Sequence, residues 1–185
     1  MICLACRRHA VGPLCGDCDA GLRPAPDQLL EGSLLIRSAY LHEGPARHLV
    51  HNFKYRGIEP AGSLLAKVMA RLVPAASTFV PVPRVTWRKL RYGIDPAAAL
   101  ATKLAKLTGG RRRDLLVAPP WGPGQAGAPR ATRRPPVFRA KGIGARQLVI
   151  VDDVVTTGGT VISAWRALGA GPALVVSATS VGGLP

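Results

Sequence analysis

The stretch from Leu148 to Thr160 reads Leu-Val-Ile-Val-Asp-Asp-Val-Val-Thr-Thr-Gly-Gly-Thr, and it decides the fold class of this 185-residue chain. Its first four residues form an apolar, mostly β-branched run, which is typical of strands covered on both faces. Apolar residues at 161, 162, 165 and 168 then follow helical spacing, and residues 173–176 supply another apolar run. Strand, loop, helix and strand in this order predict a βαβ unit, and therefore an α/β fold with a mostly parallel central sheet.

Further elements are expected before that unit. Asp95-Pro96 begins a helix that runs to residue 107, because Asp caps free N–H groups and Pro is preset for the first helical turn. Residues 119–144 are rich in Gly, Pro and Arg and predict a long irregular loop. The remaining expectations are strands at 33–41, 78–83 and 114–117 and helices at 46–56 and 64–72.

The residues after the apolar run have the chemistry of a ribose-phosphate site. Paired glycines let backbone N–H groups close around an anion, threonine hydroxyls add donors, and the following helix directs its positive end to the same point. The acidic pair upstream can accept hydrogen bonds from two adjacent sugar hydroxyls. The candidate binding residues are Asp152, Asp153, Val154, Val155, Thr156, Thr157, Gly158, Gly159 and Thr160.

A simpler interpretation of this stretch is a strand–turn–helix junction with a glycine-rich cap. Thr-Gly-Gly-Thr alone fits that interpretation, but the apolar run and the two acids before it make the phosphate site the better one. The stretch also differs from the two common nucleotide loops, because it contains neither Gly-x-x-x-x-Gly-Lys nor Gly-x-Gly-x-x-Gly.

All four cysteines of the chain lie near its start, as Cys3-x-x-Cys6 and Cys15-x-x-Cys18. Two such pairs make a tetrahedral cage of sulfur atoms for structural Zn²⁺, with no open position for catalysis. Disulfides and an iron–sulfur cluster are the alternatives. We therefore expect a zinc-ribbon-like module at residues 1–26, followed by the α/β domain at 33–185.

The formal charge of +15 is unevenly distributed. The first 32 residues contain three basic and four acidic residues, so the rest of the chain carries a net charge of +16. Such a field attracts phosphates, although charge runs are also common on solvated faces. The candidate pyrophosphate or lid residues are Arg84, Arg88, Arg91, Arg130 and Arg133.

The sequence contains no apolar stretch of membrane-spanning length and no signal-peptide pattern. We expect no membrane insertion and a cytoplasmic location.

Residues 151–160 resemble the phosphoribosyl pyrophosphate (PRPP) signature of type I phosphoribosyltransferases. Nearly the whole chain resembles the ComF family of competence-associated proteins, in which a four-cysteine zinc module precedes a domain of that type. The further stretches that carry this resemblance are Phe53-Lys54-Tyr55-Arg56-Gly57, Val80-Pro81-Val82-Pro83, Arg88 to Arg91, and Gln125. The chain departs from the family at Tyr92-Gly93-Ile94-Asp95-Pro96 and at Pro135-Pro136.

The resemblance implies that Asp152 and Asp153, the candidate catalytic residues, hold the ribose hydroxyls, while Thr156 to Thr160 cradle the 5′-phosphate. It also implies Mg²⁺ between pyrophosphate and ribose oxygens, and a role with incoming single-stranded DNA in natural transformation. Three functions are compatible with these expectations: a Mg²⁺-dependent phosphoribosyltransferase of unknown acceptor, a nucleic-acid-binding module, and a PRPP sensor without catalysis.

Overall fold

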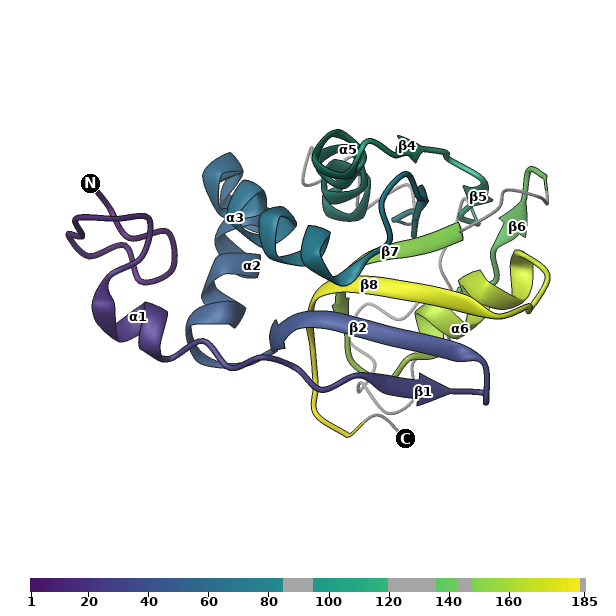
Figure 1. The fold of residues 1–185 in the computed structure, drawn as a ribbon, viewed down its shortest axis with the longest axis horizontal. Coiled ribbons are helices and arrows are strands. Elements are labelled where there is room, and N and C mark those ends of the chain that lie inside the picture. Colours follow the sequence, from purple (N-terminus) through teal and green to yellow (C-terminus); the bar gives the residue numbers. More distant parts are fainter. Residues whose placement is uncertain (85–94, 120–135, 143–147, 184–185) are drawn as a thin grey trace.

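The protein is described by a computed structural model that covers residues 1–84, 95–119, 136–142 and 148–183 (Figure 1). The strands are β1 Gln28–Leu30, β2 Leu34–Leu41, β3 Thr78–Pro81, β4 Arg111–Arg112, β5 Leu116–Val117, β6 Arg139–Ala140, β7 Leu148–Val155 and β8 Ala173–Ser180. The helices are α1 Gly16–Ala20, α2 Gly44–Arg56, α3 Glu59–Met69, the 3₁₀ turn η1 Ala70–Leu72, α5 Pro96–Thr108 and α6 Gly159–Ala167.

The main sheet has six strands in the order β1-β2-β8-β7-β3-β4. Among the described strands of this sheet, only β1 and β2 pair antiparallel; β2–β8, β8–β7, β7–β3 and β3–β4 are parallel. β7, α6 and β8 form the expected βαβ unit in the middle of this sheet. The expectation of an α/β fold with a mostly parallel sheet is therefore confirmed.

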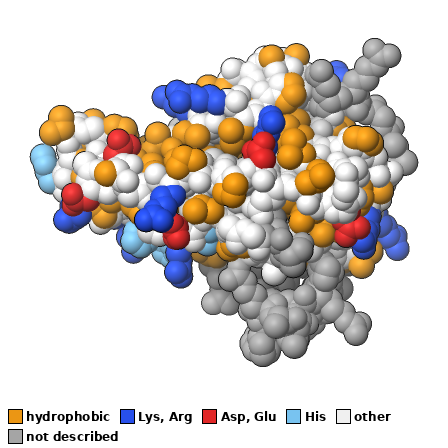
Figure 2. Space-filling view, turned by 60° about the horizontal axis from the view of Figure 1, so that its bottom comes forward, with side chains coloured by type: hydrophobic (Ala, Val, Ile, Leu, Met, Phe, Trp, Pro, Cys, Tyr) orange, Lys and Arg blue, Asp and Glu red, His pale blue; other side chains and the backbone are white. Residues whose placement is uncertain are grey.

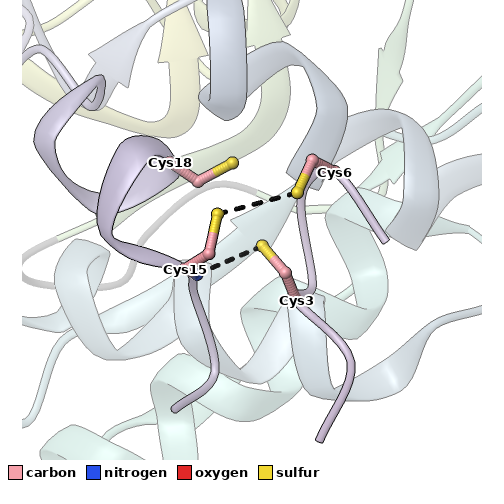
Figure 3. Close-up of side chains that lie close together, drawn as sticks. All are labelled: Cys3, Cys6, Cys15 and Cys18. Atoms are coloured by element: carbon pink, nitrogen blue, oxygen red, sulfur yellow. Dashed lines mark hydrogen bonds between the residues drawn. The ribbon is translucent and has the colours of Figure 1, made fainter. Parts of the chain in front are cut away.

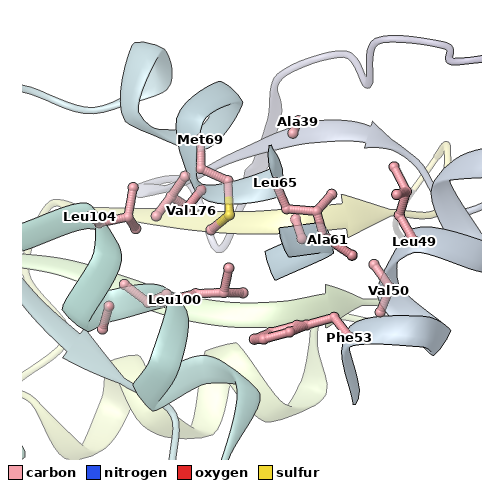
Figure 4. Close-up of a cluster of buried hydrophobic side chains, with 14 of the residues drawn as sticks. Ala39, Leu49, Val50, Phe53, Ala61, Leu65, Met69, Leu100, Leu104 and Val176 are labelled. Carbon is pink, nitrogen blue, oxygen red and sulfur yellow. The ribbon is translucent and has the colours of Figure 1, made fainter. Parts of the chain in front are cut away.

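Helices cover both faces of the sheet, which explains the apolar runs of β7 and β8. On one face, α2, α3 and α5 bury a cluster that includes Phe53, Leu65 and Leu100 together with Val149 and Val151 of β7 (Figure 4). On the other face, α6 packs on a second cluster that contains the alternate residue of β7, Ile150, and Val175 of β8. Because successive strand residues point to opposite faces, β7 contributes to both clusters.

The helix boundaries follow from capping residues. Asp95 accepts a hydrogen bond from the backbone N–H of Ala98, at 3.3 Å, and so caps α5 as predicted. Gly57 ends α2 and Gly109 ends α5, both in the left-handed conformation, with φ of 65° and 69°. That conformation favours glycine because it has no Cβ.

Some elements differ from the sequence-based expectations. The short strands β1, β4 and β6 were not predicted, since each has only two or three residues and lies at a sheet edge or in the small β5–β6 sheet. The predicted strand at 114–117 is limited to β5, at Leu116–Val117. β7 continues through the acidic pair to Val155, because pairing with β8 keeps its backbone extended beyond the apolar run.

The N-terminal cysteine segment lies at one end of the molecule, beside α2 (Figure 1). Its buried residues Cys3, Ala5, Ala10 and Cys18 belong to the same cluster as Phe53 of α2. The segment therefore shares a core with the sheet domain. In the described residues, no helix has the length and apolar character that a membrane span requires.

Candidate functional site

The candidate phosphate loop joins β7 to α6 at the carboxyl end of the parallel sheet. Residues 156–158 make the turn, and α6 begins at Gly159. The first N–H groups of a helix have no partner within the helix, and their dipole favours an anion. The carboxyl edge is also where open α/β sheets bind ligands. The loop thus has the placement that its sequence predicts.

Gly158 gives this turn its shape. Its φ is +73°, and a Cβ at this position would lie 2.5 Å from Cδ1 of Leu30. Both the backbone conformation and the close approach of β1 favour glycine here. The carbonyl of Gly158 then accepts the N–H of Ile162, at 2.9 Å, at the start of α6.

Asp152 and Asp153 lie inside β7, three and two residues before its end, respectively. Asp153 is buried, and Asp152 is half-buried with its Oδ1 accepting the backbone N–H of Asp153 at 2.8 Å. Across the sheet, Asp152 is paired in register with Ser177 of β8, whose hydroxyl is buried and 2.6 Å from that of Ser38. The acidic pair therefore lies among polar side chains toward the carboxyl end of β7, in an otherwise apolar sheet.

Lys54 of α2 forms an ion pair with Asp153, joining the ammonium to Oδ2 of the carboxylate. The side chains are only 20% and 11% exposed, so the pair is shielded from water. Lys54 lies in the stretch Phe53 to Gly57 that resembles the ComF family, but the sequence does not predict it as a site residue. Its contact with the acidic pair depends on how α2 packs over β7, which no local sequence pattern encodes.

The two carboxyl groups differ in their protonation. Burial, together with the negative charge of Asp153, raises the pKa of Asp152 well above its ordinary value. Burial also opposes ionisation of Asp153, but the Lys54 ammonium, aided by the charges of Arg84, outweighs it and lowers the pKa of Asp153. Asp153 is thus the ionised member of the pair, and Asp152 is the member that retains a proton more readily.

Arg84 is the candidate pyrophosphate residue that the described structure brings to the acidic pair. It follows β3, which lies beside β7 with Pro81 in register with Val151, and its charge acts on Asp153. The other candidates, Arg88, Arg91, Arg130 and Arg133, lie outside the described residues.

Oδ2 of Asp153 does not fit Mg²⁺ in this arrangement. Oδ2 of Asp153 is already in contact with the Lys54 ammonium. A divalent ion on the same carboxylate would lie about 4 Å from that ammonium, where the repulsion is on the order of 8 kcal/mol at an effective dielectric constant of about 20.

The four cysteines form a second candidate site. Their sulfur atoms all lie within 4.8 Å of one another and point to a common centre (Figure 3), and all four are free thiols. The Sγ atoms of Cys6 and Cys15 are 3.7 Å apart. A Zn–S distance of about 2.3 Å puts the sulfurs of a tetrahedral site about 3.8 Å apart, so the cluster is compatible with a structural zinc site.

The surroundings of the cluster favour the thiolate form of Cys3 and Cys6 and disfavour that of Cys18. Hydrogen bonding to the backbone N–H and the guanidinium of Arg8 lowers the pKa of Cys6 to about 6. Burial opposes ionisation of Cys3, but backbone N–H groups, including that of Cys15 at 3.4 Å, lower its pKa overall. Burial and the neighbouring sulfur atoms raise the pKa of Cys18 to about 12. A cation among the four sulfur atoms would stabilise the Cys18 thiolate, which burial and the neighbouring sulfur atoms disfavour.

Asn52 fixes the cysteine segment to α2. Its buried side-chain amide donates to the backbone carbonyls of Leu4 and Ala5, at 2.8 and 2.9 Å. Asn52 and Lys54 lie on the same helix, two residues apart, so α2 contacts both candidate sites. No sequence pattern predicts the role of Asn52, because an Asn in a helix is usually exposed.

Two hollows in the described surface lie away from the acidic pair. One is at the opposite, amino end of the sheet, beside Leu148 and Ala173, and the other lies between the cysteine segment and helices α3 and α5.

No protein-family model matches the chain, and no curated protein matches it either.

Proposed function

We propose that the chain binds a phosphorylated ribose of the PRPP type at the carboxyl end of β7 and transfers its phosphoribosyl group with release of pyrophosphate. The observation that carries this proposal is the placement of an ionised Asp153 beside a glycine-threonine loop that opens α6. The Asp153 carboxylate, which accepts hydrogen bonds from sugar hydroxyls, then lies a few residues from the N–H and hydroxyl groups of residues 156–160, which donate to a phosphate. Both lie at the carboxyl end of β7. The likeness of this stretch to the PRPP signature supports the same reading.

In this proposal Asp152 and Asp153 accept hydrogen bonds from the ribose hydroxyls, and residues 156–160 surround the 5′-phosphate. Departure of pyrophosphate leaves positive charge on the sugar, which the Asp153 carboxylate stabilises. We assign neutralisation of the leaving group to Arg84, whose charge acts on the nearby Asp153. Such chemistry needs no protein nucleophile. The nucleophile is the acceptor, whose identity depends on pocket shape.

The test is calorimetric titration of PRPP into the wild-type protein and into Asp153→Asn. Binding should be lost in the variant because its amide is neutral and cannot replace the carboxylate. Asp114→Asn is the control, since Asp114 is an exposed acid paired with Arg112. Pyrophosphate release with a panel of amines and nucleobases then tests turnover. Equal PRPP affinity of wild type and Asp153→Asn would contradict the assigned role.

We infer that the four cysteines hold a structural zinc ion. The support is their mutual approach within 4.8 Å and the N–H groups directed at sulfur. With four sulfur ligands the metal would have no open position, so its contribution is to the fold of the N-terminal segment.

Single-stranded nucleic acid is a second candidate ligand, favoured by the exposed face of α2. Between Gly44 and Arg56 this helix has no acidic residue, and its exposed side chains are Arg47, His48, His51, Tyr55 and Arg56. Figure 2 shows basic and histidine side chains near one another toward the narrow, N-terminal end of the molecule. The rings of His51 and Tyr55, 5.1 Å apart, could stack on bases.

The test for this candidate is fluorescence anisotropy of a single-stranded oligonucleotide over a range of salt concentrations. Arg47→Ala combined with Arg56→Ala should weaken binding and reduce its salt dependence by about two phosphate contacts. The matched control is Lys67→Ala with Lys106→Ala, which removes the same charge from exposed positions on α3 and α5. Binding that does not depend on salt would exclude this candidate.

A further inference from the structure

The Lys54 ammonium occupies the place on the Asp153 carboxylate that a divalent cation would otherwise take. Its ammonium contacts Oδ2 of Asp153, and that oxygen has no other hydrogen-bond partner among the described residues. A carboxylate taken out of water needs a compensating charge. In this structure the compensating charge comes from a side chain.

The position of Lys54 is fixed by its neighbours on α2. Phe53 is fully buried against the sheet, and Asn52 donates to two carbonyls of the cysteine segment. The ammonium also lies 5.9 Å from the centre of the Tyr55 ring, a favourable position for a cation. Lys54 is therefore held over β7 by the packing of its helix, unlike a lysine on an open surface.

We propose that Lys54 is the resident cation of the acidic pair, and that a phosphorylated ribose binds here without a divalent metal. This inference rests on the proposed function and deepens it. A sugar hydroxyl both donates and accepts hydrogen bonds. The Asp153 carboxylate supplies the acceptor and the Lys54 ammonium supplies the donor, so together they match one hydroxyl without any metal between them.

The test is calorimetric titration of ribose 5-phosphate, which lacks the pyrophosphate that would carry its own Mg²⁺. The buffer is freed of divalent ions by passage over a chelating resin, so that no soluble chelator competes for zinc in the protein. Titrations with and without added Mg²⁺ should give affinities within about twofold of each other.

Variants of Lys54 give a second, independent readout. Lys54→Met removes the charge and should weaken binding at least about tenfold, whereas Lys54→Arg keeps the charge and should stay within about threefold of wild type. Lys103→Met is the matched control, because Lys103 also sits in a half-buried ion pair, with Glu59 at 2.8 Å, but on α5. This control should bind as wild type does.

Three results would overturn the inference. Wild-type binding that needs Mg²⁺, or unchanged affinity in a folded Lys54→Met, refutes it while leaving the proposed function in place. Absence of ribose 5-phosphate binding with and without Mg²⁺ refutes both. The metal dependence of the wild-type protein decides the question even if Lys54→Met does not fold.

Discussion

Asp152 is a half-buried carboxyl group beside the buried, ionised Asp153, and this neighbour makes its own ionisation unfavourable. Its pKa is therefore higher in the folded chain than in the unfolded one. Such a group stabilises the fold most at pH values below its ordinary pKa, and this contribution is lost as the pH rises through the folded-state pKa. At neutral pH and above, the ionised Asp152 is thus unfavourable for folding, although the proposed function assigns it to ligand binding.

Asp152→Asn should stabilise the protein near pH 8, raising the midpoint of thermal unfolding by about 2–4 °C. The amide retains an oxygen that can accept the N–H of Asp153 but carries no charge. The gain in stability should shrink toward about pH 4, where the wild-type Asp152 carboxyl group is protonated. Thermal melts of both proteins across this range measure the effect, and a variant less stable than wild type near pH 8 would contradict it.

Gly158 gives a prediction about backbone conformation. Gly158→Ala should lower the free energy of unfolding by about 1–2 kcal/mol, because alanine is strained at a φ of +73° and its Cβ would contact Leu30. Denaturant titration measures the change. Gly171→Ala is the control, since a Cβ there meets nothing within 4 Å and φ is ordinary. A Gly158→Ala variant as stable as the control would show that the turn can relax.

At the residue scale, the sequence predicted candidate site residues that lie close to one another along the chain. The cysteine pairs were predicted from their spacing and were confirmed as a cluster. The candidate phosphate loop was predicted from its composition and its place between a strand and a helix. Lys54 was missed as a site residue because its partner, Asp153, lies on a different element. A contact of that kind depends on the tertiary arrangement of α2 and β7, and chain spacing does not reveal it.

At the scale of elements, α2 connects the two candidate sites. Its buried face includes Leu49, Val50 and Phe53, which pack in the core, while Asn52 binds the cysteine segment and Lys54 pairs with Asp153. Periodicity predicted this helix and its end at Gly57. It did not predict which partners the polar side chains on the helix would meet, since the 3.6-residue repeat reports burial alone.

Asn52→Leu tests this connection. Leucine has a similar volume but cannot donate, so the carbonyls of Leu4 and Ala5 would lose a buried partner, at about 1–3 kcal/mol each. We expect a lower unfolding midpoint and weaker zinc retention in competition with a chromophoric chelator. His48→Leu, on the exposed side of α2, is the control. Zinc retention equal to wild type would show that the cysteine segment does not depend on α2.

At the scale of the whole molecule, the order of elements was enough to predict the α/β class. Strand, helix and strand around residues 148–176 leave few arrangements other than a parallel sheet. The extent of β7 was harder to predict, because Asp is a poor strand former and only pairing with β8 keeps Asp152 and Asp153 extended. The docking of the cysteine segment depends on surface shape, and no pattern in the sequence describes it.

The shared core gives the last prediction, which concerns the proposed zinc. Cys3, Ala5, Ala10 and Cys18 are buried in the same cluster as Phe53, so loss of metal should disturb α2 as well as the N-terminal segment. We expect one zinc per chain by elemental analysis, and a chelator should lower the unfolding midpoint by more than about 10 °C. A chelator already saturated with zinc is the control. Because α2 also carries Lys54, metal removal should weaken ribose 5-phosphate binding even though the cysteines do not touch the ligand. If the unfolding midpoint and the binding were both unchanged after complete zinc removal, the cysteine segment and the sheet domain would be energetically independent.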